Sequence, residues 1–390
     1  MMRIATGDFE DRHRLINRRG TWSAKWESLP SDHISLSVAE MEFVCAPAIR
    51  SAIANAAVRG IYSYTEVFPD FAGACTSWFT RRHGTEFGEE SVVFVPRIVE
   101  ATAMICAHML PARAKVITLS PAYDPIMEVV RRCGCQVTEP AMRYADGAWQ
   151  IPFDQLATML PDADLFILTN PHNPTGRAFT PKELERLAAL LDQSSCLVLS
   201  DDIHCDILRA GQQWSPLARY ADAGLRTRLI TALSPSKSFN IAGLEASALI
   251  VPDPALRARI RDGLRAAGFH NPNYFAIPAA IAAWTQCEEW LDTTLAYIDN
   301  NMARFAPRFA ALFAKEKPVI PEATYLFWCD TRALGAAAAK EVCTAAGVHP
   351  SYGEGFGAQW RDYLRFNLAA PQSLLDAALE RCEAAAQKLK

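Results

Sequence analysis

The sequence predicts an α/β protein with a large domain, in which helices cover a mostly parallel sheet, and a smaller α+β domain. Two observations carry this prediction. Short apolar runs of four to six residues alternate with amphipathic stretches of helical length, which is typical of parallel strands covered on both faces. After about residue 285 the pattern changes to one long helical stretch followed by isolated short strands.

Six apolar runs in the first part of the chain are rich in β-branched and aromatic residues, which is typical of buried strands. They are residues 92–95, 115–119, 164–169, 196–200, 228–232 and 247–251. Between two of them, residues 181–191 show the pattern of an amphipathic helix. Thr180 can cap its first turn, Pro181 suits the first helical position, and Glu183 completes a capping box.

The second part of the chain predicts a helix over residues 288–313, short strands near 324–329 and 363–368, and an alanine-rich helix from Pro371. The first 45 residues hold no α/β unit and can join either domain. We assign residues 46–285 to the large domain, and residues 1–45 and 286–390 to the small one.

Composition excludes several classes of protein. Half of the 390 residues are hydrophobic and 21% are charged, far from the composition of disordered chains. The net charge is -4 without long runs of one sign, so neither nucleic acid nor an anionic membrane is an expected partner. No apolar run reaches the length of a membrane span or a signal peptide, and the eleven cysteines lack zinc-ligand spacing. We therefore expect a cytoplasmic protein with reduced thiols and no metal site.

Four polar clusters follow predicted strands, where ligands bind in open α/β sheets. Taken singly, each has an ordinary structural explanation: an Asn-Pro turn, an acidic helix cap, a surface lysine and an ion-paired arginine. The clusters are Asn-Pro-His-Asn-Pro-Thr-Gly-Arg at 170–177, Ser-Asp-Asp-Ile-His-Cys-Asp at 200–206, Ser-Pro-Ser-Lys-Ser-Phe-Asn-Ile-Ala-Gly-Leu at 234–244 and Arg-Phe-Asn-Leu-Ala-Ala-Pro at 365–371.

Taken in order, the clusters resemble those of the pyridoxal 5'-phosphate (PLP) enzymes of fold-type I, the aspartate aminotransferase fold. Asp201 stands 28 residues after Asn173, and Lys237 follows 36 residues later. More narrowly, the chain resembles the MalY/PatB-type cystathionine β-lyases and cysteine C–S lyases, over about residues 18–371. The segments that carry this resemblance are residues 38–43, 60–65, 200–206 and 236–243.

The resemblance implies a role for each residue around the cofactor ring. Lys237 binds the cofactor covalently and later acts as the base, which requires that burial lower the pKa of its amine. Asp201 keeps the ring nitrogen protonated. Asn173 and His204 reach the phenolic oxygen, and Tyr123 stacks on the ring and assists catalysis.

The cofactor phosphate is expected at a helix N-terminus, where free N–H groups and the helix dipole favour an anion. The backbone of Ile98 and Val99 is the expected cradle, to which Ser234 and Ser236 add hydroxyl groups. By resemblance, Tyr64 reaches the phosphate of the other subunit, which implies a homodimer with shared active sites.

On the substrate side, the resemblance assigns Arg365 to the α-carboxylate, which a guanidinium group can bind with two hydrogen bonds. Ala39 and Asn173 are assigned to the same site. Asp202 and His172 are expected to have structural roles.

Several positions depart from the family pattern. Arg97 stands where relatives usually carry glycine, Ser37 where they carry tryptophan, and Glu40 and Glu42 where they carry aspartates. Glu245, eight residues after the lysine, occupies a position where many relatives have a phosphate-binding arginine. A carboxylate facing a phosphate would be repelled, so we expect Glu245 to point away or to pair with a cation such as Arg97. These changes leave the substrate open.

The resemblance implies α,β-elimination of a cysteine thioether (an S-conjugate) to a thiol, pyruvate and ammonia, with a secondary-metabolic substrate as one option. The alternatives with the same cofactor are transamination and a decarboxylating oxidative deamination that yields an aldehyde. A regulatory protein that retains the lyase site is a third hypothesis, although no additional domain in the sequence favours it.

Overall fold

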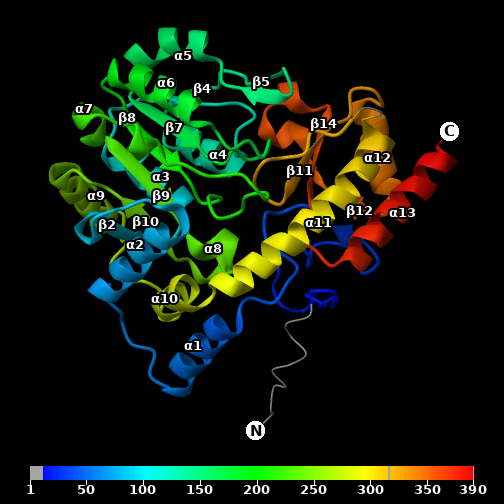
Figure 1. Ribbon diagram of the computed structural model, residues 1–390, viewed down its shortest axis with the longest axis horizontal. Coiled ribbons are helices and arrows are strands. Elements are labelled where there is room, and N and C mark those ends of the chain that lie inside the picture. Colours follow the sequence, from blue (N-terminus) through cyan, green and yellow to red (C-terminus); the bar gives the residue numbers. More distant parts are fainter. Residues whose placement is uncertain (1–11, 315–316, 390) are drawn as a thin grey trace.

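The structure, a computed structural model, describes residues 12–314 and 317–389. Within them, the centre of the molecule is a seven-stranded sheet in the order β2-β10-β9-β8-β7-β3-β4 (Figure 1). β10 is antiparallel to both of its neighbours, and the other neighbouring pairs are parallel. The strands are β2 (Val92–Val95), β3 (Lys115–Thr118), β4 (Gln136–Thr138), β7 (Leu165–Thr169), β8 (Leu197–Asp201), β9 (Leu229–Leu233) and β10 (Ser247–Ile250).

Each of the six predicted strands is present, so the α/β prediction is confirmed. The edge strand β4 was missed, because its three residues are largely exposed and lack an apolar run. The predicted capping box is also present: the Thr180 hydroxyl accepts a hydrogen bond from the Glu183 N–H, and the Glu183 carboxylate accepts one from the Thr180 N–H.

Alternate residues of the parallel strands pack into two cores, one on each face of the sheet. In β7, Leu165 and Ile167 face one core, whereas Phe166 and Leu168 face the other. Both faces are therefore buried, which explains the unbroken apolar runs. The first core is covered by α3 (Ile98–His108), α4 (Asp124–Arg132) and α9 (Pro254–Ala266), and the second by α5 (Phe153–Met159), α6 (Pro181–Asp192) and α7 (Ala223–Arg226).

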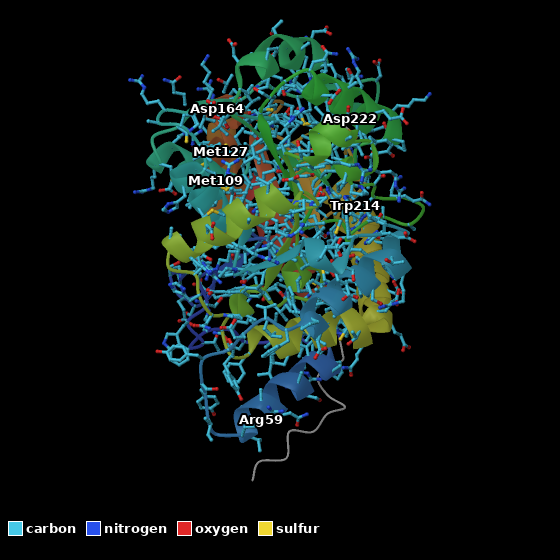
Figure 2. The ribbon with its side chains drawn as sticks, turned by 90° about the vertical axis from the view of Figure 1, so that its left-hand side faces the viewer. Arg59, Met109, Met127, Asp164, Trp214 and Asp222 are labelled. Carbon is cyan, nitrogen blue, oxygen red and sulfur yellow. The ribbon has the colours of Figure 1, made fainter. Side chains whose placement is uncertain are left out.

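A third core packs against strands β2, β9 and β10 of the sheet, and in it Phe71, Trp78 and Trp284 are fully buried. Its helices are α1 (Pro47–Val58), α2 (Pro69–His83) and α10 (Ala276–Gln286). The end of α1 near Arg59 projects from the body of the molecule (Figure 2).

The long predicted helix is α11 (Glu288–Phe313), which runs across Figure 1 from α8 (Pro235–Ser238) towards α12. Its first half packs into the third core through Leu291 and Ile298, and its second half packs into a fourth core through Phe305 and Phe309. The remaining elements are a sheet of β11 (Leu326–Asp330), β14 (Tyr363–Asn367) and β13 (Ser351–Tyr352), the helices α12 (Ala336–Ala346) and α13 (Gln372–Lys388), the pair β1 (Ile34–Ser35) and β12 (Val348–His349), and the hairpin β5 (Arg143–Ala145) and β6 (Ala148–Gln150).

The segment before α1 connects two cores. Trp26 and Leu36 pack in the fourth core, whereas Met41 and Phe43 pack in the third. The division of the chain at residues 45 and 285 stays a prediction. In the described part of the chain, no helix has the length and apolar character needed to span a membrane, and all eleven cysteines are free thiols.

Candidate active site

One edge of the central sheet collects most of the predicted site residues. Strands β2, β3, β7, β8 and β9 all point their carboxyl ends to the same edge, because β2 and β9 are both antiparallel to β10. Ile98, Tyr123, Asn173, Asp201 and Lys237 each end one of these strands or follow shortly after it. The topology therefore brings together residues that are up to 139 positions apart in the sequence.

Lys237 lies on α8, a helix of only four residues that follows β9. Burial lowers the pKa of its amine to about 8, and the Arg365 cation lowers it further, whereas the carboxylates of Glu40 and Asp201 raise it. About a tenth of the amine is then neutral at pH 7, far more than for an exposed lysine. The Lys237 Nζ donates a hydrogen bond to the Ala39 carbonyl at 2.7 Å.

Asp201 ends β8 and is buried. Burial raises the pKa of its carboxyl group to about 7, although a hydrogen bond from the Ile203 N–H and the charge of Lys237 lower it. In contrast, the neighbouring Asp202 accepts two contacts from the Ser200 hydroxyl at 3.0 and 3.1 Å, which fits its expected structural role. Because the hydrogen bond from the Ile203 N–H reaches only the Oδ1 of Asp201, the other oxygen of Asp201 can accept a hydrogen bond from a cationic N–H group.

His204 is buried, and its Nδ1 has no hydrogen-bond partner among the described residues. Burial lowers the pKa of its imidazole to about 3, and the charges of Lys237 and Arg365 lower it further, so the ring is neutral. An unpaired polar atom in such a position costs free energy unless a ligand contacts it.

Arg365 projects from β14 and is buried without an ion pair to any described residue. Its guanidinium donates to the Asn173 Oδ1 and to the Ser351 Oγ, both at 3.0 Å, while its Nε has no described partner. Burial lowers its pKa to about 10, and the interactions with Tyr123 and Tyr325 oppose that effect. A buried cation that lacks a counter-ion is suited to bind a carboxylate.

The N-terminus of α3 is free for an anion. Arg97 precedes the helix in extended conformation, and no side chain caps the first turn, so the N–H groups of Ile98 and Val99 are available. Ser234 and Ser236 are joined by a hydrogen bond of 2.8 Å between their hydroxyl groups.

Glu245 forms an ion pair with Arg97, as expected from its unfavourable charge. Glu100, in the first turn of α3, also lies near this pair: burial raises its pKa, Arg97 lowers it and Glu245 raises it. The two other acids that depart from the family pattern are ion-paired as well, Glu40 to Arg18 at 2.8 Å and Glu42 to Lys25 at 2.6 Å.

The other predicted residues lie as follows. Tyr123 is the residue directly before α4, and it interacts electrostatically with Arg365 and Asp201. Ala39 contributes its backbone carbonyl. His172 is buried in its loop, where its Nδ1 contacts the Thr175 hydroxyl at 2.9 Å. Tyr64 is 93% exposed.

Sequence reasoning missed Tyr325 and Ser351. The buried Tyr325 hydroxyl donates to the Ala39 carbonyl at 3.0 Å, and Ser351 supports the Arg365 guanidinium. Ser351 lies on β13 of the second sheet, and Tyr325 directly precedes β11. Neither residue is part of a sequence motif. No local signal could have found them, because their contacts depend on how the chain folds back.

Comparison with known proteins identifies the family. The family model "Aminotransferase class I and II" matches residues 31–382. The chain belongs to this family. The fold and family expected from the motifs are thereby confirmed.

Two curated relatives are similar over nearly their whole length. Cystathionine beta-lyase PatB of Bacillus subtilis (strain 168) is 32% identical over 378 residues, which cover 94% of this chain and 97% of PatB. Protein MalY of Escherichia coli (strain K12) is 29% identical over 381 residues, which cover 94% and 96%. The crystal structure of cystalysin from Treponema denticola, which contains a PLP cofactor, matches with a TM-score of 0.91 and 26% identity over 97% of this chain and 99% of cystalysin.

The residues at the sheet edge fit PLP. Its phosphate matches the open N-terminus of α3, its ring nitrogen matches the Asp201 carboxylate, and its aldehyde matches an amine with a lowered pKa. The unpaired His204 Nδ1 is a further buried polar atom for which such a ligand provides a partner.

We predict that Asp201→Asn stabilises the cofactor-free protein at about pH 8. Asp201 has its pKa raised in the folded state, so the stability that it contributes below its ordinary pKa of 3.8 is lost as the pH rises through about 7. The free energy of unfolding that the wild-type protein loses through Asp201 over this pH range is about 4 kcal/mol at most. Urea unfolding of the wild-type and variant proteins at about pH 5 and about pH 8 measures it.

The exposed Asp262→Asn, on α9, is the matched control, and it should leave the pH dependence of the wild-type protein unchanged. Equal pH dependence of unfolding for wild type and Asp201→Asn would contradict the account.

Proposed function

We propose that this chain is a PLP-dependent C–S β-lyase that cleaves a cysteine thioether to a thiol, pyruvate and ammonia. The observation that carries the proposal is the grouping of Lys237, Asp201 and the unpaired Arg365 at the sheet edge. The similarity to cystathionine beta-lyase PatB supports the C–S lyase reaction over the other reactions of this cofactor.

The cofactor is PLP, which supplies an electron sink for negative charge at the substrate Cα when it is bound. Lys237 would hold it covalently, and Asp201 would hold a proton on its ring nitrogen. Asn173 and His204 would donate hydrogen bonds to its phenolic oxygen. Ser234 and Ser236 would add their hydroxyl groups to the phosphate cradle at the N-terminus of α3.

Arg365 orients the substrate. Its guanidinium is held by Asn173 and Ser351 and has no carboxylate partner among residues 12–314 and 317–389, so a substrate α-carboxylate offsets the cost of its burial. Because the guanidinium is fixed before the substrate binds, little conformational entropy is lost when the α-carboxylate is bound.

Lys237 is the base. The Lys237 amine would remove the Cα proton of the bound substrate, for which its lowered pKa makes it suitable at neutral pH. As the electron pair of the Cα–H bond forms the Cα–Cβ double bond, the Cβ–S bond would break and the sulfur would leave as a thiolate, which takes up the proton held by the Lys237 ammonium to give the thiol. The released aminoacrylate takes up water and gives pyruvate and ammonia.

The chain acts as a homodimer with shared active sites. Around the projecting end of α1, large apolar side chains are exposed, which is unusual for a surface that only water covers (Figure 2). These side chains are Val58, Ile61, Tyr62, Tyr64 and Phe68. A second copy would cover them and bring Tyr64 to the phosphate cradle of the partner.

The free thiols support a reducing compartment. All eleven cysteines are unpaired, and nine of them are buried. Such a set of thiols is typical of proteins in the cytoplasm, which is the location that we propose.

We predict that the purified protein, supplied with PLP and either cystathionine or an S-alkylcysteine, releases thiol and pyruvate in equal amounts. Lys237→Ala should lower the rate at least about a thousandfold, because the variant lacks the proposed base for the Cα proton. Thiol is measured by a chromogenic disulfide and pyruvate by coupled reduction. Products without thiol, an aldehyde or an intact keto acid with the sulfur retained, would contradict the proposal in favour of decarboxylation or transamination.

We predict that Tyr64→Phe weakens cofactor binding about tenfold while the dimer persists, because the phosphate loses a hydrogen bond to a charged group. Spectroscopic titration of the cofactor-free protein with PLP measures the Kd, and sedimentation measures the dimer. Tyr144→Phe, on the β5–β6 hairpin, is the control. A monomeric wild-type protein, or an unchanged Kd for Tyr64→Phe, would refute the shared site.

A further inference from the structure

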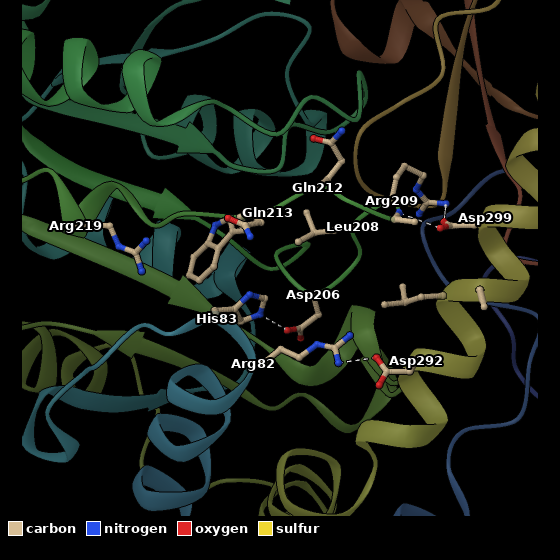
Figure 3. Close-up of a pocket in the computed structure, with 14 residues that line it drawn as sticks. Arg82, His83, Asp206, Leu208, Arg209, Gln212, Gln213, Arg219, Asp292 and Asp299 are labelled. Atoms are coloured by element: carbon tan, nitrogen blue, oxygen red, sulfur yellow. Dashed lines mark hydrogen bonds and ion pairs between the residues drawn. The ribbon is translucent and has the colours of Figure 1, made fainter.

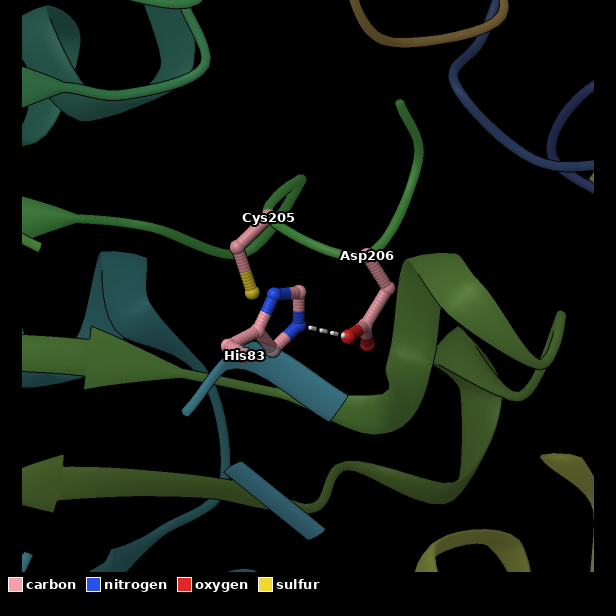
Figure 4. Close-up of side chains that lie close together, drawn as sticks. All are labelled: His83, Cys205 and Asp206. Atoms are coloured by element: carbon pink, nitrogen blue, oxygen red, sulfur yellow. Dashed lines mark hydrogen bonds and ion pairs between the residues drawn. The ribbon is translucent and has the colours of Figure 1, made fainter. Parts of the chain in front are cut away.

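A buried carboxylate, that of Asp206, is hydrogen-bonded to the short helix that carries Lys237. The Asp206 carboxylate accepts three hydrogen bonds: from the His83 Nε2 at 2.7 Å and the Trp78 Nε1 at 3.0 Å on one oxygen, and from the Ser238 hydroxyl at 2.6 Å on the other. Figure 4 shows His83 and Asp206 side by side. We call His83, Trp78, Asp206 and Ser238 the Asp206 network.

The network joins three elements that carry the catalytic groups or support them. Trp78 and His83 belong to the end of α2, and Ser238 is the neighbour of Lys237 on α8. Asp206 lies in the loop after β8.

Asp201 ends β8 and His204 lies in this loop, so Asp206 links the helix of the lysine to the segment that would hold the cofactor ring. A helix as short as α8 does not hold its own conformation in water. Its position depends on tertiary contacts, and the bond from Ser238 to Asp206 is one of them.

Asp206 is charged in the folded protein. Burial raises the pKa of its carboxyl group, but the hydrogen bond and charge of His83 and the hydrogen bonds from Ser238 and Trp78 outweigh burial and hold the pKa below its ordinary value. His83 is thus a hydrogen-bond donor to a carboxylate that in turn accepts a hydrogen bond from the helix of Lys237.

A metal ion is a weaker explanation of this cluster. The ligand atoms of His83, Cys205 and Asp206 do lie within 4.8 Å of one another. However, Asp206 already accepts three hydrogen bonds, and burial together with the charges of Asp206 and Asp202 raises the pKa of Cys205 well above its ordinary value. A protonated thiol and a carboxylate with its acceptors in use do not favour a cation.

Two residues of the Asp206 network, His83 and Asp206, line a cavity of about 510 Å³ (Figure 3). His83 and Asp206 lie at its base, and the His83 ring is held between Phe79 and Trp214. The other charged groups around it are occupied elsewhere: Arg82 pairs with Asp292, Arg209 pairs with Asp299, and Arg219 donates to the Gly84 carbonyl and the Thr85 hydroxyl.

We propose that His83 is a positioning residue which, through Asp206 and Ser238, holds the Lys237 amine in register with Asp201 and His204. The inference rests on the proposed function, because it takes Lys237 as the catalytic amine. It adds that part of the catalytic geometry is set by a group that contacts neither cofactor nor substrate.

The test compares wild-type holoenzyme with His83→Ala, His83→Gln and Ser238→Ala. For His83→Ala we expect kcat to fall about 10- to 100-fold with KM changed little, because the amine is displaced while Arg365 still binds the substrate. The pH at which the visible absorbance of the bound cofactor changes should shift, because the Lys237 amine is displaced relative to Asp201 and His204. Added imidazole, which can enter the cavity, should restore part of kcat.

The other variants decide the matter even if His83→Ala does not fold. His83→Gln keeps a hydrogen-bond donor for Asp206, so kcat and the absorbance midpoint should stay closer to wild type than in His83→Ala. Ser238→Ala should lower kcat without imidazole rescue. Gln212→Ala, which lines the same cavity outside the network, is the control and should match wild type.

Wild-type values of kcat and of the absorbance midpoint in Ser238→Ala would overturn the inference, as would a His83→Gln variant whose kcat falls as far as that of His83→Ala. A wild-type protein that binds no PLP would instead refute the proposed function, so the two failures are distinguishable.

Discussion

Three charged groups meet at one edge of the sheet without forming an ion pair with one another: Asp201 and Arg365, which are buried, and Lys237, which is half-buried. Asp201, Lys237 and Arg365 each have a pKa shifted by burial towards the neutral form. Buried ions that lack partners destabilise a fold, so this arrangement is tolerated only because the cores on both faces of the sheet hold it in place. Because the three groups are not ion-paired with one another, they are available to a cofactor and an amino-acid substrate.

The sheet topology explains how these groups come together. Parallel strands direct their carboxyl ends to one edge, and the segments after β3, β7, β8 and β9 each deliver one polar group there. The second sheet adds Arg365 from the opposite side, on a strand whose position depends on α11 and the fourth core. The site therefore depends on how the two parts of the chain pack, and not on any single motif.

Much of the fold could be predicted from local pattern. The strands are unbroken apolar runs because both of their faces are buried, and α6 has a capping box within its first turn. The reversed direction of β10 could not be predicted, since nothing in its four residues differs from a parallel strand. The candidate site was accessible in part through the order and spacing of the four clusters.

Long-range partners within the site were beyond sequence reasoning, with one exception. The pairing of Glu245 with Arg97 could be anticipated, because a carboxylate near a phosphate site needs a cation. The contact of His83 with Asp206 spans 123 positions and involves residue types that are common in any α/β protein. Only the structure shows that this contact is linked through Ser238 to α8, the helix that carries Lys237.

The measurement that tests the central claim most directly is chemical trapping of the cofactor. The protein is incubated with PLP, reduced with borohydride, digested and analysed by mass spectrometry. The account predicts a single modified peptide, with the cofactor on Lys237, and its loss when Asp201 is replaced by alanine. A protein that stays colourless and unmodified, or that carries the cofactor on other lysines with Lys237 free, would contradict it.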